Sequence, residues 1–248
     1  MKNRIIGCIL AAIVLLAVWH IFSVLLNKAF LPTPLESFNA FCSLLSSGEM
    51  SKQFAVSAMR IVVSIIIGLV LSIPLGIILG RSEKANTFIG PLVYLLYPIP
   101  KIVFLPVIIV LLGLGNAPKI LLITIVIFFQ IVVVTRDAAR AVPENLAMSM
   151  RSLGVNRRQF TRYLILPYCF PDILTSLRVS IGTAIAVLFV AETFVSLDGL
   201  GYLILNGMET RQYPDMYAGV IGMAILGVLL YLIVDVLENV FCRWKKYY

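Results

Sequence analysis

The chain has 248 residues, of which 60% are hydrophobic and only 13% are charged, and its mean hydropathy is +1.01. A soluble domain carries about 25% charged residues, so this composition excludes a soluble protein and indicates an integral membrane protein. The apolar runs are continuous rather than alternating, which excludes a β-barrel and predicts an all-α polytopic fold. The net charge of +8 is then mostly a signal of membrane topology, and no nucleic-acid partner is expected.

Six apolar segments are long enough, alone or with their flanks, to provide the 20 or so helical residues that cross a bilayer. In chain order they are Ile5–Leu26, Ile61–Gly80, Ala85–Pro118, Ile120–Thr135, Val179–Ala191 and Met216–Val234. The third is interrupted only by Lys101, and the fifth must extend to include Arg178 or Glu192. We interpret residues 1–248 as a single transmembrane domain, with a first-span anchor at about 5–27 and a core of five spans at about 54–241.

The positions of the Lys and Arg residues predict the orientation, because cytoplasmic segments of membrane proteins are enriched in them. With the N-terminus inside, fourteen of the twenty Lys and Arg residues fall in inner segments. Three of these fourteen, Arg243, Lys245 and Lys246, follow the last span. The predicted topology is therefore N-in and C-in.

Residues 136–167 form a strongly basic stretch between two apolar segments. An arginine at the bilayer centre costs roughly 2.5–3.5 kcal/mol, so this stretch must lie on the aqueous side of the membrane. Its six arginines are Arg136, Arg140, Arg151, Arg157, Arg158 and Arg162. A solvated basic loop that only follows the topology rule is one interpretation. The capping residues of the stretch favour a folded unit instead.

Two short helices are predicted in this stretch. Pro143 suits the first turn of a helix, and Gly154 is a natural helix stop. Asn156, with Gln159 three residues later, can form the capping box of a second helix, which Pro167 would end. We therefore expect two helices joined by a glycine elbow, in a cytoplasmic coupling region at about residues 139–168.

The same stretch resembles the EAA loop of binding-protein-dependent ABC importer permeases. The pattern of that family is Glu-Ala-Ala, three residues, Gly, nine residues, Ile, any residue, Leu-Pro. Gly154 is followed after nine residues by the sequence Leu-Ile-Leu-Pro at 164–167, in which Leu164 takes the Ile position. Met148, Ser149 and Met150 stand where the family often has Glu-Ala-Ala, so the acidic residue of the motif is replaced here.

Further motifs extend the resemblance over nearly the whole chain and are similar to the nitrate/sulfonate/taurine branch of that family. They are Leu31-Pro32-Thr33-Pro34, Ile73-Pro74-Leu75-Gly76, Pro98-Ile99-Pro100-Lys101, Ala191-Glu192 and Gly199-Leu200-Gly201. No single motif is decisive, but their order and spacing together are highly specific.

The resemblance implies a type I ABC importer permease fold in the bacterial cytoplasmic (inner) membrane. It also implies a second permease copy, as a homodimer, together with an ABC ATPase subunit and an extracytoplasmic solute-binding protein. The chain itself would be no enzyme and would hold no cofactor, because ATP and Mg²⁺ would be bound by the ATPase. In agreement, the sequence contains no Gly-Lys dipeptide and hence no phosphate-binding loop of the G-x-x-x-x-G-K-[ST] type.

The resemblance also implies that the loop of residues 143–167 couples the permease to its ATPase. The residues expected to carry this coupling are Met148, Ser149, Met150, Ser152, Leu153, Gly154, Val155, Arg157, Leu164, Leu166 and Pro167.

Three polar residues within or next to the spans are candidates for the translocation pathway, because burying a polar group in a membrane is costly. Lys101 could meet an anionic solute such as a sulfonate, taurine or nitrate, or could extend to a membrane interface. Gln130 could bind the solute or another helix, and Glu192 could act in gating or in structure. A metal site is not expected, because the single histidine, His20, has no second ligand at metal spacing.

A stand-alone secondary transporter or channel is the alternative function. It would need no ATPase but would need an intramembrane relay of ionisable groups, and the scarcity of carboxylates within the spans argues against it. The solute itself cannot be read from the sequence, since similar permeases handle sulfonates, taurine, nitrate, bicarbonate and precursors of pyrimidines or flavins.

Overall fold

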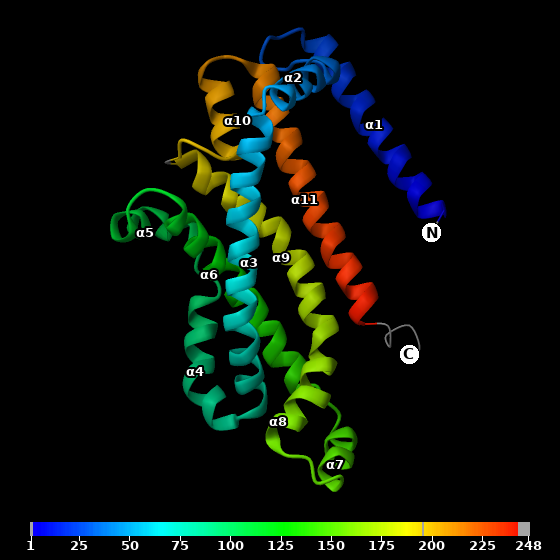
Figure 1. The fold of residues 1–248 in the computed structure, drawn as a ribbon, viewed down its shortest axis with the longest axis vertical. Helices are drawn as coiled ribbons and strands as arrows, with labels where there is room; N and C mark the ends of the chain where they lie inside the picture. The colour runs from blue at the N-terminus through cyan, green and yellow to red at the C-terminus, as the bar shows by residue number, and fades with distance from the viewer. Residues whose placement is uncertain (1, 195, 243–248) are drawn as a thin grey trace. The chain divides into compact units, whose positions relative to one another are not determined.

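The computed structural model of this chain describes residues 2–194 and 196–242, and within these ranges it consists of helices and turns without a β-strand (Figure 1). The basic residues 243, 245 and 246, which contribute to the predicted C-in orientation, lie outside the described residues. Internal contacts divide the chain into two units. Unit 1 comprises residues 1–57 and 192–225, and unit 2 comprises residues 58–191 and 226–248. The predicted grouping of the chain as a single domain stays a prediction.

Unit 1 contains α1 (Lys2–Leu26), α2 (Pro34–Ser46), the start of α3 (Glu49–Arg81), α10 (Leu200–Glu209) and the first part of α11 (Tyr213–Phe241). α1 is joined to the rest of the unit by Trp19, whose ring stacks on Tyr217 and whose indole N–H donates to the carbonyl of Pro32 at 3.1 Å. α10 packs closely on α11 because glycines stand at the contact. A Cβ atom at Gly207 would lie only 2.6 Å from the backbone nitrogen of Met216, so a side chain at this position would not fit.

Unit 2 contains the remaining helices. They are the rest of α3, α4 (Glu83–Leu96), the 3₁₀ turn η1 (Lys101–Phe104), α5 (Leu105–Leu112), α6 (Asn116–Arg140), α7 (Glu144–Ser152), α8 (Arg157–Phe160), the π turn η2 (Thr161–Ile165), most of α9 (Leu166–Phe194) and the end of α11.

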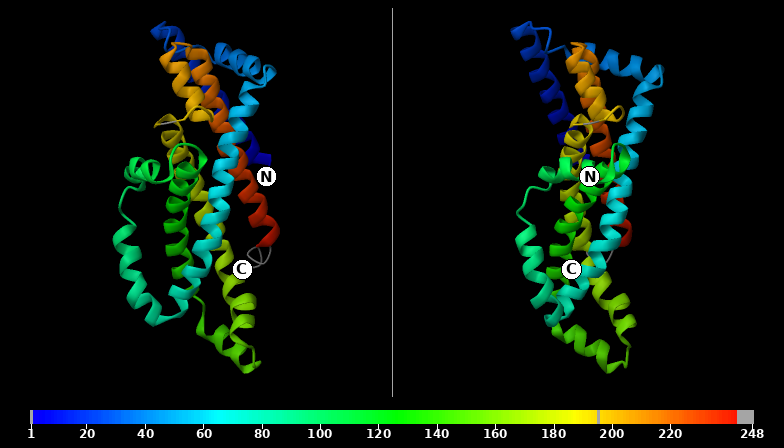
Figure 2. Two further views of the ribbon diagram at one scale, coloured as in Figure 1. Left: turned by 60° about the vertical axis from the view of Figure 1, so that its left-hand side comes forward. Right: turned by 90° about the vertical axis from the view of Figure 1, so that its left-hand side faces the viewer.

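α6 is the most buried helix of unit 2. Leu122, Ile127 and Ile131 on this helix are completely buried. Its middle part packs with α3 and α4 through a cluster around Leu79 and Val132, and both views of Figure 2 show α4 beside these two helices. A second cluster joins α5 and α6 to α9. These contacts place α6 and α9 next to each other, and the cavities described below lie along them.

Within the described residues, four helical segments are long and apolar enough to cross a membrane: α3, α6, the continuous helix from Arg157 to Phe194, and α11. The helix pair of Glu83–Leu96 and Lys101–Leu112 makes a fifth if it is counted as one span, and α1 contributes a shorter apolar stretch at Leu10–Leu26. Each predicted span therefore falls on a helix or a helix pair. The number six and the N-in/C-in orientation stay predictions.

The predicted third span, Ala85–Pro118, is a bent helix pair rather than one straight helix, and only its C-terminal limit is wrong. α4 and α5 are bent by 84° relative to each other, and Pro118 belongs to α6. Prolines 98 and 100 lie at the bend, where their missing N–H groups cannot continue the helical hydrogen bonds of α4. α5 ends at Gly113, whose φ of +74° is open to glycine at little cost.

The predicted fifth span, Val179–Ala191, is only the middle of α9. The helix begins at Leu166, so it includes both Arg178 and Glu192. Arg178 remains within an apolar helix because its guanidinium pairs with Asp235, at 3.2 Å, and with Glu238, both on α11. An ion pair of this kind lets a charged side chain remain within a span.

Gly80 is predicted to be essential for the packing of α3 on α6. A Cβ atom at this position would lie 2.6 Å from both the Cβ of Ala139 and the carbonyl oxygen of Arg136, so Gly80→Ala overpacks the contact and should cost about 1–3 kcal/mol. Gly182→Ala is the matched control, because a Cβ atom at Gly182 meets nothing within 4 Å. Thermal unfolding of the purified variants in detergent checks this. An equal midpoint for the two variants would contradict it.

Candidate functional site

The first helix of the coupling segment (residues 143–167) presents apolar side chains to its surroundings. α7 begins directly after Pro143, with Glu144 in its first turn, where a negative charge stabilises the positive end of the helix dipole. Ala147 is buried, whereas Met148 is 56% exposed and Leu153, at the end of the helix, is 77% exposed. Part of the apolar surface of this helix is therefore uncovered.

The predicted glycine elbow and the capping box that follows it are confirmed. Gly154 has a φ of +69°, a conformation that other residues adopt only at a cost. Asn156 then accepts the backbone N–H of Gln159 at 2.9 Å, and the Gln159 side chain accepts the backbone N–H of Asn156 at 2.9 Å. These bonds satisfy two N–H groups at the start of α8 that have no partner within the helix.

The prediction that Pro167 ends the second helix is wrong. α8 continues through η2 into α9, so that a single helix runs from Arg157 to Phe194. Before the proline the helix widens to π geometry, with the backbone N–H of Leu166 bonded to the carbonyl of Thr161 five residues earlier. Such a bulge is a common place for the regular hydrogen-bond pattern to shift, and Pro167 removes a donor only in the first turn of the regular helix that follows.

Phe160 connects the coupling segment to α3. The guanidinium of Arg81, the last residue of α3, lies 5.5 Å from the centre of the Phe160 ring, and the guanidinium of Arg151 lies 5.9 Å from it. Cation–π contacts of this kind contribute roughly 0.5–1 kcal/mol at exposed sites. The elbow is thus attached both to α9, through the chain, and to the end of α3, through side chains.

The eleven predicted coupling residues form two groups in the structure. Six are exposed on α7, the elbow and the start of α8: Met148, Ser149, Ser152, Leu153, Gly154 and Arg157. The other five are partly buried: Met150, Val155, Leu164, Leu166 and Pro167. The first group is open to a partner, and the second supports the segment from within. The contact of these residues with an ATPase stays a prediction.

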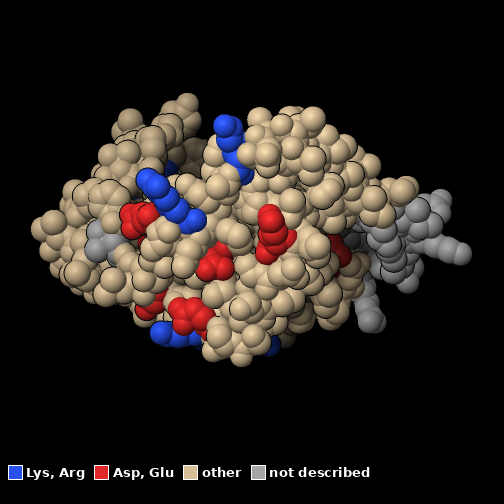
Figure 3. All heavy atoms as spheres, turned by 90° about the horizontal axis from the view of Figure 1, so that it is seen from above, with Lys and Arg blue, Asp and Glu red and all other residues tan. Residues whose placement is uncertain are grey.

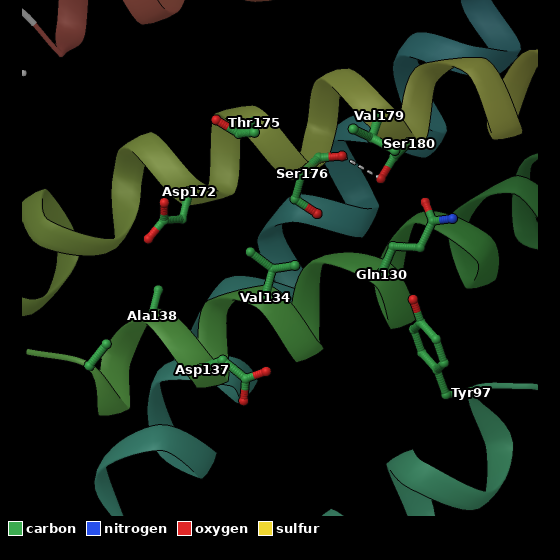
Figure 4. A pocket seen from close by; sticks show the side chains of 11 residues that line it. Tyr97, Gln130, Val134, Asp137, Ala138, Asp172, Thr175, Ser176, Val179 and Ser180 are labelled. Carbon is green, nitrogen blue, oxygen red and sulfur yellow. Dashed lines mark hydrogen bonds between the residues drawn. The ribbon is translucent and has the colours of Figure 1, made fainter.

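A cavity of about 600 Å³, here called the acidic cavity, lies between α6 and α9 (Figure 4). Its lining residues are Tyr97, Gln130, Val134, Asp137, Ala138, Ala141, Asp172, Thr175, Ser176, Val179 and Ser180. Asp172, Ser176 and Ser180 follow each other at intervals of four along α9, which places them on one face of the helix. In Figure 4 the side chains of Asp172 and Ser176 lie between the ribbons of the two helices.

A second cavity of about 320 Å³, here called the lysine cavity, is lined by Lys101 and shares Tyr97 and Gln130 with the acidic cavity. The Lys101 ammonium donates to the carbonyl oxygens of Leu96, at 2.8 Å, and Tyr97. It also lies 4.9 Å from the centre of the Phe129 ring. The structure therefore brings two of the predicted pathway residues, Lys101 and Gln130, to one site.

The third predicted pathway residue, Glu192, belongs to unit 1 and lines neither cavity. Its carboxylate is completely buried and accepts the hydroxyl of Ser57, at 2.8 and 2.9 Å, and the backbone N–H of Gly201 at 2.8 Å. The Ser57 hydroxyl in turn accepts the N–H of Leu200 at 2.8 Å. Because these N–H groups begin α10, the carboxylate lies at the positive end of a helix dipole. Its place in a translocation pathway stays a prediction.

Gly199 is part of the same arrangement, here called the Glu192 clamp. Its N–H donates to the side chain of Gln53, its φ is +102°, and a Cβ atom at this position would lie 2.4 Å from the Glu192 carboxyl carbon. The first glycine of the Gly-Leu-Gly motif is thus explained by a buried carboxylate that leaves no room for a side chain.

Sequence reasoning did not identify Asp172, Ser176 and Ser180 as candidate site residues. Their spacing of four residues, which places them on one face of a helix, was the available signal. It was not used, because hydropathy placed the start of that span at Val179, after Asp172 and Ser176. Ser57 and Gln53 were also not identified. They lie far from Glu192 and Gly199 in the chain, and nothing in the local sequence marks them as partners.

Comparisons with known proteins agree over most of the chain. A family model described as "Binding-protein-dependent transport system inner membrane component" matches residues 72–247. A putative aliphatic sulfonates transport permease of Bacillus subtilis is 30% identical over 244 residues, with 98% of this chain and 88% of that protein covered. The taurine transport system permease of Escherichia coli is 28% identical, with 93% and 86% covered.

A formylaminopyrimidine transport permease of Halalkalibacterium halodurans is 26% identical, with 94% of both chains covered. Among solved structures, a chain of the MetNI methionine ABC transporter in an inward-facing conformation matches with a TM-score of 0.65 and 19% identity, covering 76% of this chain and 94% of that one. At this identity the likeness concerns the fold, which is that of a type I importer permease.

Ser57 is predicted to be required for the Glu192 clamp. Ser57→Ala removes the hydroxyl, whose single proton is shared between the two oxygens of the buried carboxylate, and with it the acceptor of the Leu200 N–H. A hydrogen bond to a charged group contributes about 1.5–3 kcal/mol. The variant should unfold at a lower temperature, and the first amides of α10 should exchange hydrogen faster. Ser46→Ala is the control, because its hydroxyl makes an exposed bond within α2. Unchanged exchange in α10 would refute this role.

Proposed function

This chain belongs to the family of binding-protein-dependent transport system inner membrane components, and from that premise we propose that it couples to a separate ATPase through residues 143–167. The members are permeases of ABC importers rather than enzymes, and the chain is a multi-pass protein of the bacterial cytoplasmic membrane. In this proposal the chain, with a second identical copy, forms the pathway of a small solute. ATP and Mg²⁺ are bound by the ATPase.

The observation that carries the proposal is the exposed apolar surface of the coupling segment. Exposed apolar side chains are ordinary on a helix that faces lipid, but Leu153 and Met148 lie among arginines that cannot enter the bilayer. A cluster of this kind in an aqueous setting marks a surface that binds another protein. The positive φ of Gly154 and the capping box at Asn156 hold this surface in one shape.

The continuous helix from Arg157 to Phe194 supports a direct path for coupling. A displacement of the elbow by the ATPase is transmitted along this helix to the residues that line the acidic cavity, because a helix moves as a stiff element. Phe160, held between Arg81 and Arg151, transmits the same displacement to the end of α3. One docking event thus acts on two helices of unit 2.

We assign the polar surface of unit 1 to the solute-binding protein. α2 begins with a complete capping box between Thr33 and Glu36 and is therefore a fixed element rather than a loose loop. Lys28, Glu36, Glu209 and Arg211 of this unit are exposed, and Figure 3 shows acidic and basic side chains interspersed on the molecule seen from above. Mixed charges of this kind favour a specific, oriented encounter with a partner of matching charges.

The solute is proposed to be a small anion-bearing compound such as a sulfonate, taurine or nitrate. The names of the sulfonate and taurine permeases among the relatives support this class. Lys101, with its positive charge beside the lysine cavity, supports it independently.

Gly154→Val is predicted to release the ATPase. A β-branched residue at a φ of +69° is strained, so the elbow would change shape and the docking surface with it. Gly48→Val is the matched control, since Gly48 has a φ of +82° and equally open surroundings but lies between α2 and α3. Co-purification of the ATPase with the tagged permease measures the effect. Retention of the ATPase by the Gly154 variant would contradict the proposal, as would transport by the purified chain without nucleotide.

Leu153→Asp tests the apolar docking surface without strain in the backbone. The side chain is already 77% exposed, so the variant should fold normally but lose ATPase binding and solute-dependent ATP hydrolysis. Leu197→Asp introduces the same change at a residue that is 89% exposed in unit 1, and it should leave ATPase binding unchanged. Equal ATPase binding by the two variants would exclude Leu153 from the interface.

A further inference from the structure

The acidic cavity and the lysine cavity meet at Tyr97 and Gln130, which line both. Their ionisable lining residues differ in sign. Among the described residues, carboxylates (Asp137 and Asp172) line the first cavity, and an ammonium group (Lys101) lines the second. A solute that moves from one cavity to the other therefore passes between environments of opposite charge.

Asp172 is the uncompensated charge of the acidic cavity. It is exposed and makes no hydrogen bond or ion pair with another described residue, and its side chain lies between α9 and α6 (Figure 4). Asp137 differs, because Arg136 pairs with it at 2.8 Å. A free carboxylate with the Ser176 hydroxyl one helical turn away is the environment that a cationic amine requires.

Lys101 provides the positive charge that lines the lysine cavity. An ammonium group has three donors, and two of them are directed at the backbone carbonyls of Leu96 and Tyr97. Its other neighbours are the faces of aromatic rings. These partners are neutral, so the positive charge is held in place but is not cancelled, and one donor remains for an anionic group.

Gln130 lies where the two cavities meet, and its hydrogen bonding indicates a binding site there independently of the charges. Its amide oxygen is buried and has no hydrogen-bond partner among the described residues, while its amide nitrogen makes a long contact of 3.5 Å with the Thr183 hydroxyl. A buried acceptor without a partner costs about 1–3 kcal/mol. A solute N–H group at this junction would satisfy it.

We infer that the two cavities select a zwitterionic solute, whose amine is held at Asp172 and whose anionic group is held at Lys101. The inference rests on the proposed function and narrows its solute class. Asp172 lines the acidic cavity and Thr183 lines the lysine cavity, and the two residues are eleven positions apart on α9, or about 16 Å along the helix, so a small zwitterion meets the two charges in turn. Taurine is of this class, whereas nitrate and sulfonates without an amine are not.

Thiol labelling measures the two potentials directly. The full-length chain with its four native cysteines replaced by alanine receives Ser176→Cys or Thr183→Cys and reacts with cationic and anionic methanethiosulfonates of similar size. The cationic reagent should react faster at position 176, and Asp172→Asn should reduce that preference by about fivefold, as expected for a unit charge about 6 Å away in a wet cavity. The anionic reagent should be preferred at position 183, and Lys101→Gln should remove that preference.

Two controls accompany the labelling. Asp137→Asn should change the ratio at position 176 less than Asp172→Asn does, because Arg136 already neutralises Asp137. A chain that retains only the exposed Cys42, in unit 1, should show no response to Asp172→Asn. A ratio at position 176 that does not depend on Asp172, or a ratio at position 183 that does not depend on Lys101, would overturn the inference.

Protection from labelling tests the solute class with taurine and isethionate, which differ mainly in an ammonium group against a hydroxyl group. At high concentration taurine should slow labelling at both positions and isethionate only at position 183, and Asp172→Asn should abolish the difference at position 176. Equal protection of position 176 by the two compounds, or none by taurine, would refute the inference. The measurement needs no ATPase, so its failure is separate from a failure of the Gly154 and Leu153 tests.

Discussion

The high cost of leaving a polar group unpaired in hydrocarbon governs this structure. Where the helices are regular, backbone groups satisfy one another, and the remaining polar side chains must find partners across helices. Arg178 does so with two carboxylates on α11, and Glu192 does so with Ser57 and the first amides of α10. Among the described residues that line the cavities, the buried Gln130 oxygen has no hydrogen-bond partner, and the exposed Asp172 carboxylate has no ion-pair partner. They therefore stand out as groups for a ligand.

The helix that begins at Arg157 joins the coupling segment to the cavities. Its first turn follows the glycine elbow, its middle carries Asp172 and Ser176, and it continues to Phe194 without a break. A proline would normally stop such a helix. The π turn at Thr161–Ile165 places Pro167 where the loss of one donor is tolerated, and the helix remains continuous. The continuity of this helix makes a mechanical link between the exposed elbow and the solute pathway physically reasonable.

A feature could be predicted from the sequence when the residues that form it are close together along the chain. The capping box at Asn156 was predictable because a helix N-terminus is decided by residues within one turn of it. The angle of the bend after Tyr97 was not predicted, since hydropathy does not record direction. Asp172 was missed because a hydropathy window starts a span at its first apolar run, whereas the helix starts earlier. The bond between Ser57 and Glu192 joins residues 135 positions apart, and one sequence does not show such pairing.

Unit 2 carries charged residues in two settings, on the exposed coupling segment and in the two cavities. In our proposal the first set serves coupling to the ATPase and the second set serves selection of the solute. The arginines of the coupling segment are exposed, and Arg151 contacts the Phe160 ring beside the elbow, so their charges are screened by water and lie outside the two cavities. Asp172 and Lys101 act in cavities, where fewer water molecules screen a charge and a single group can decide which solute is held. We therefore expect that exchanging these two cavity side chains alters which solute is bound and leaves the contact with the ATPase unchanged.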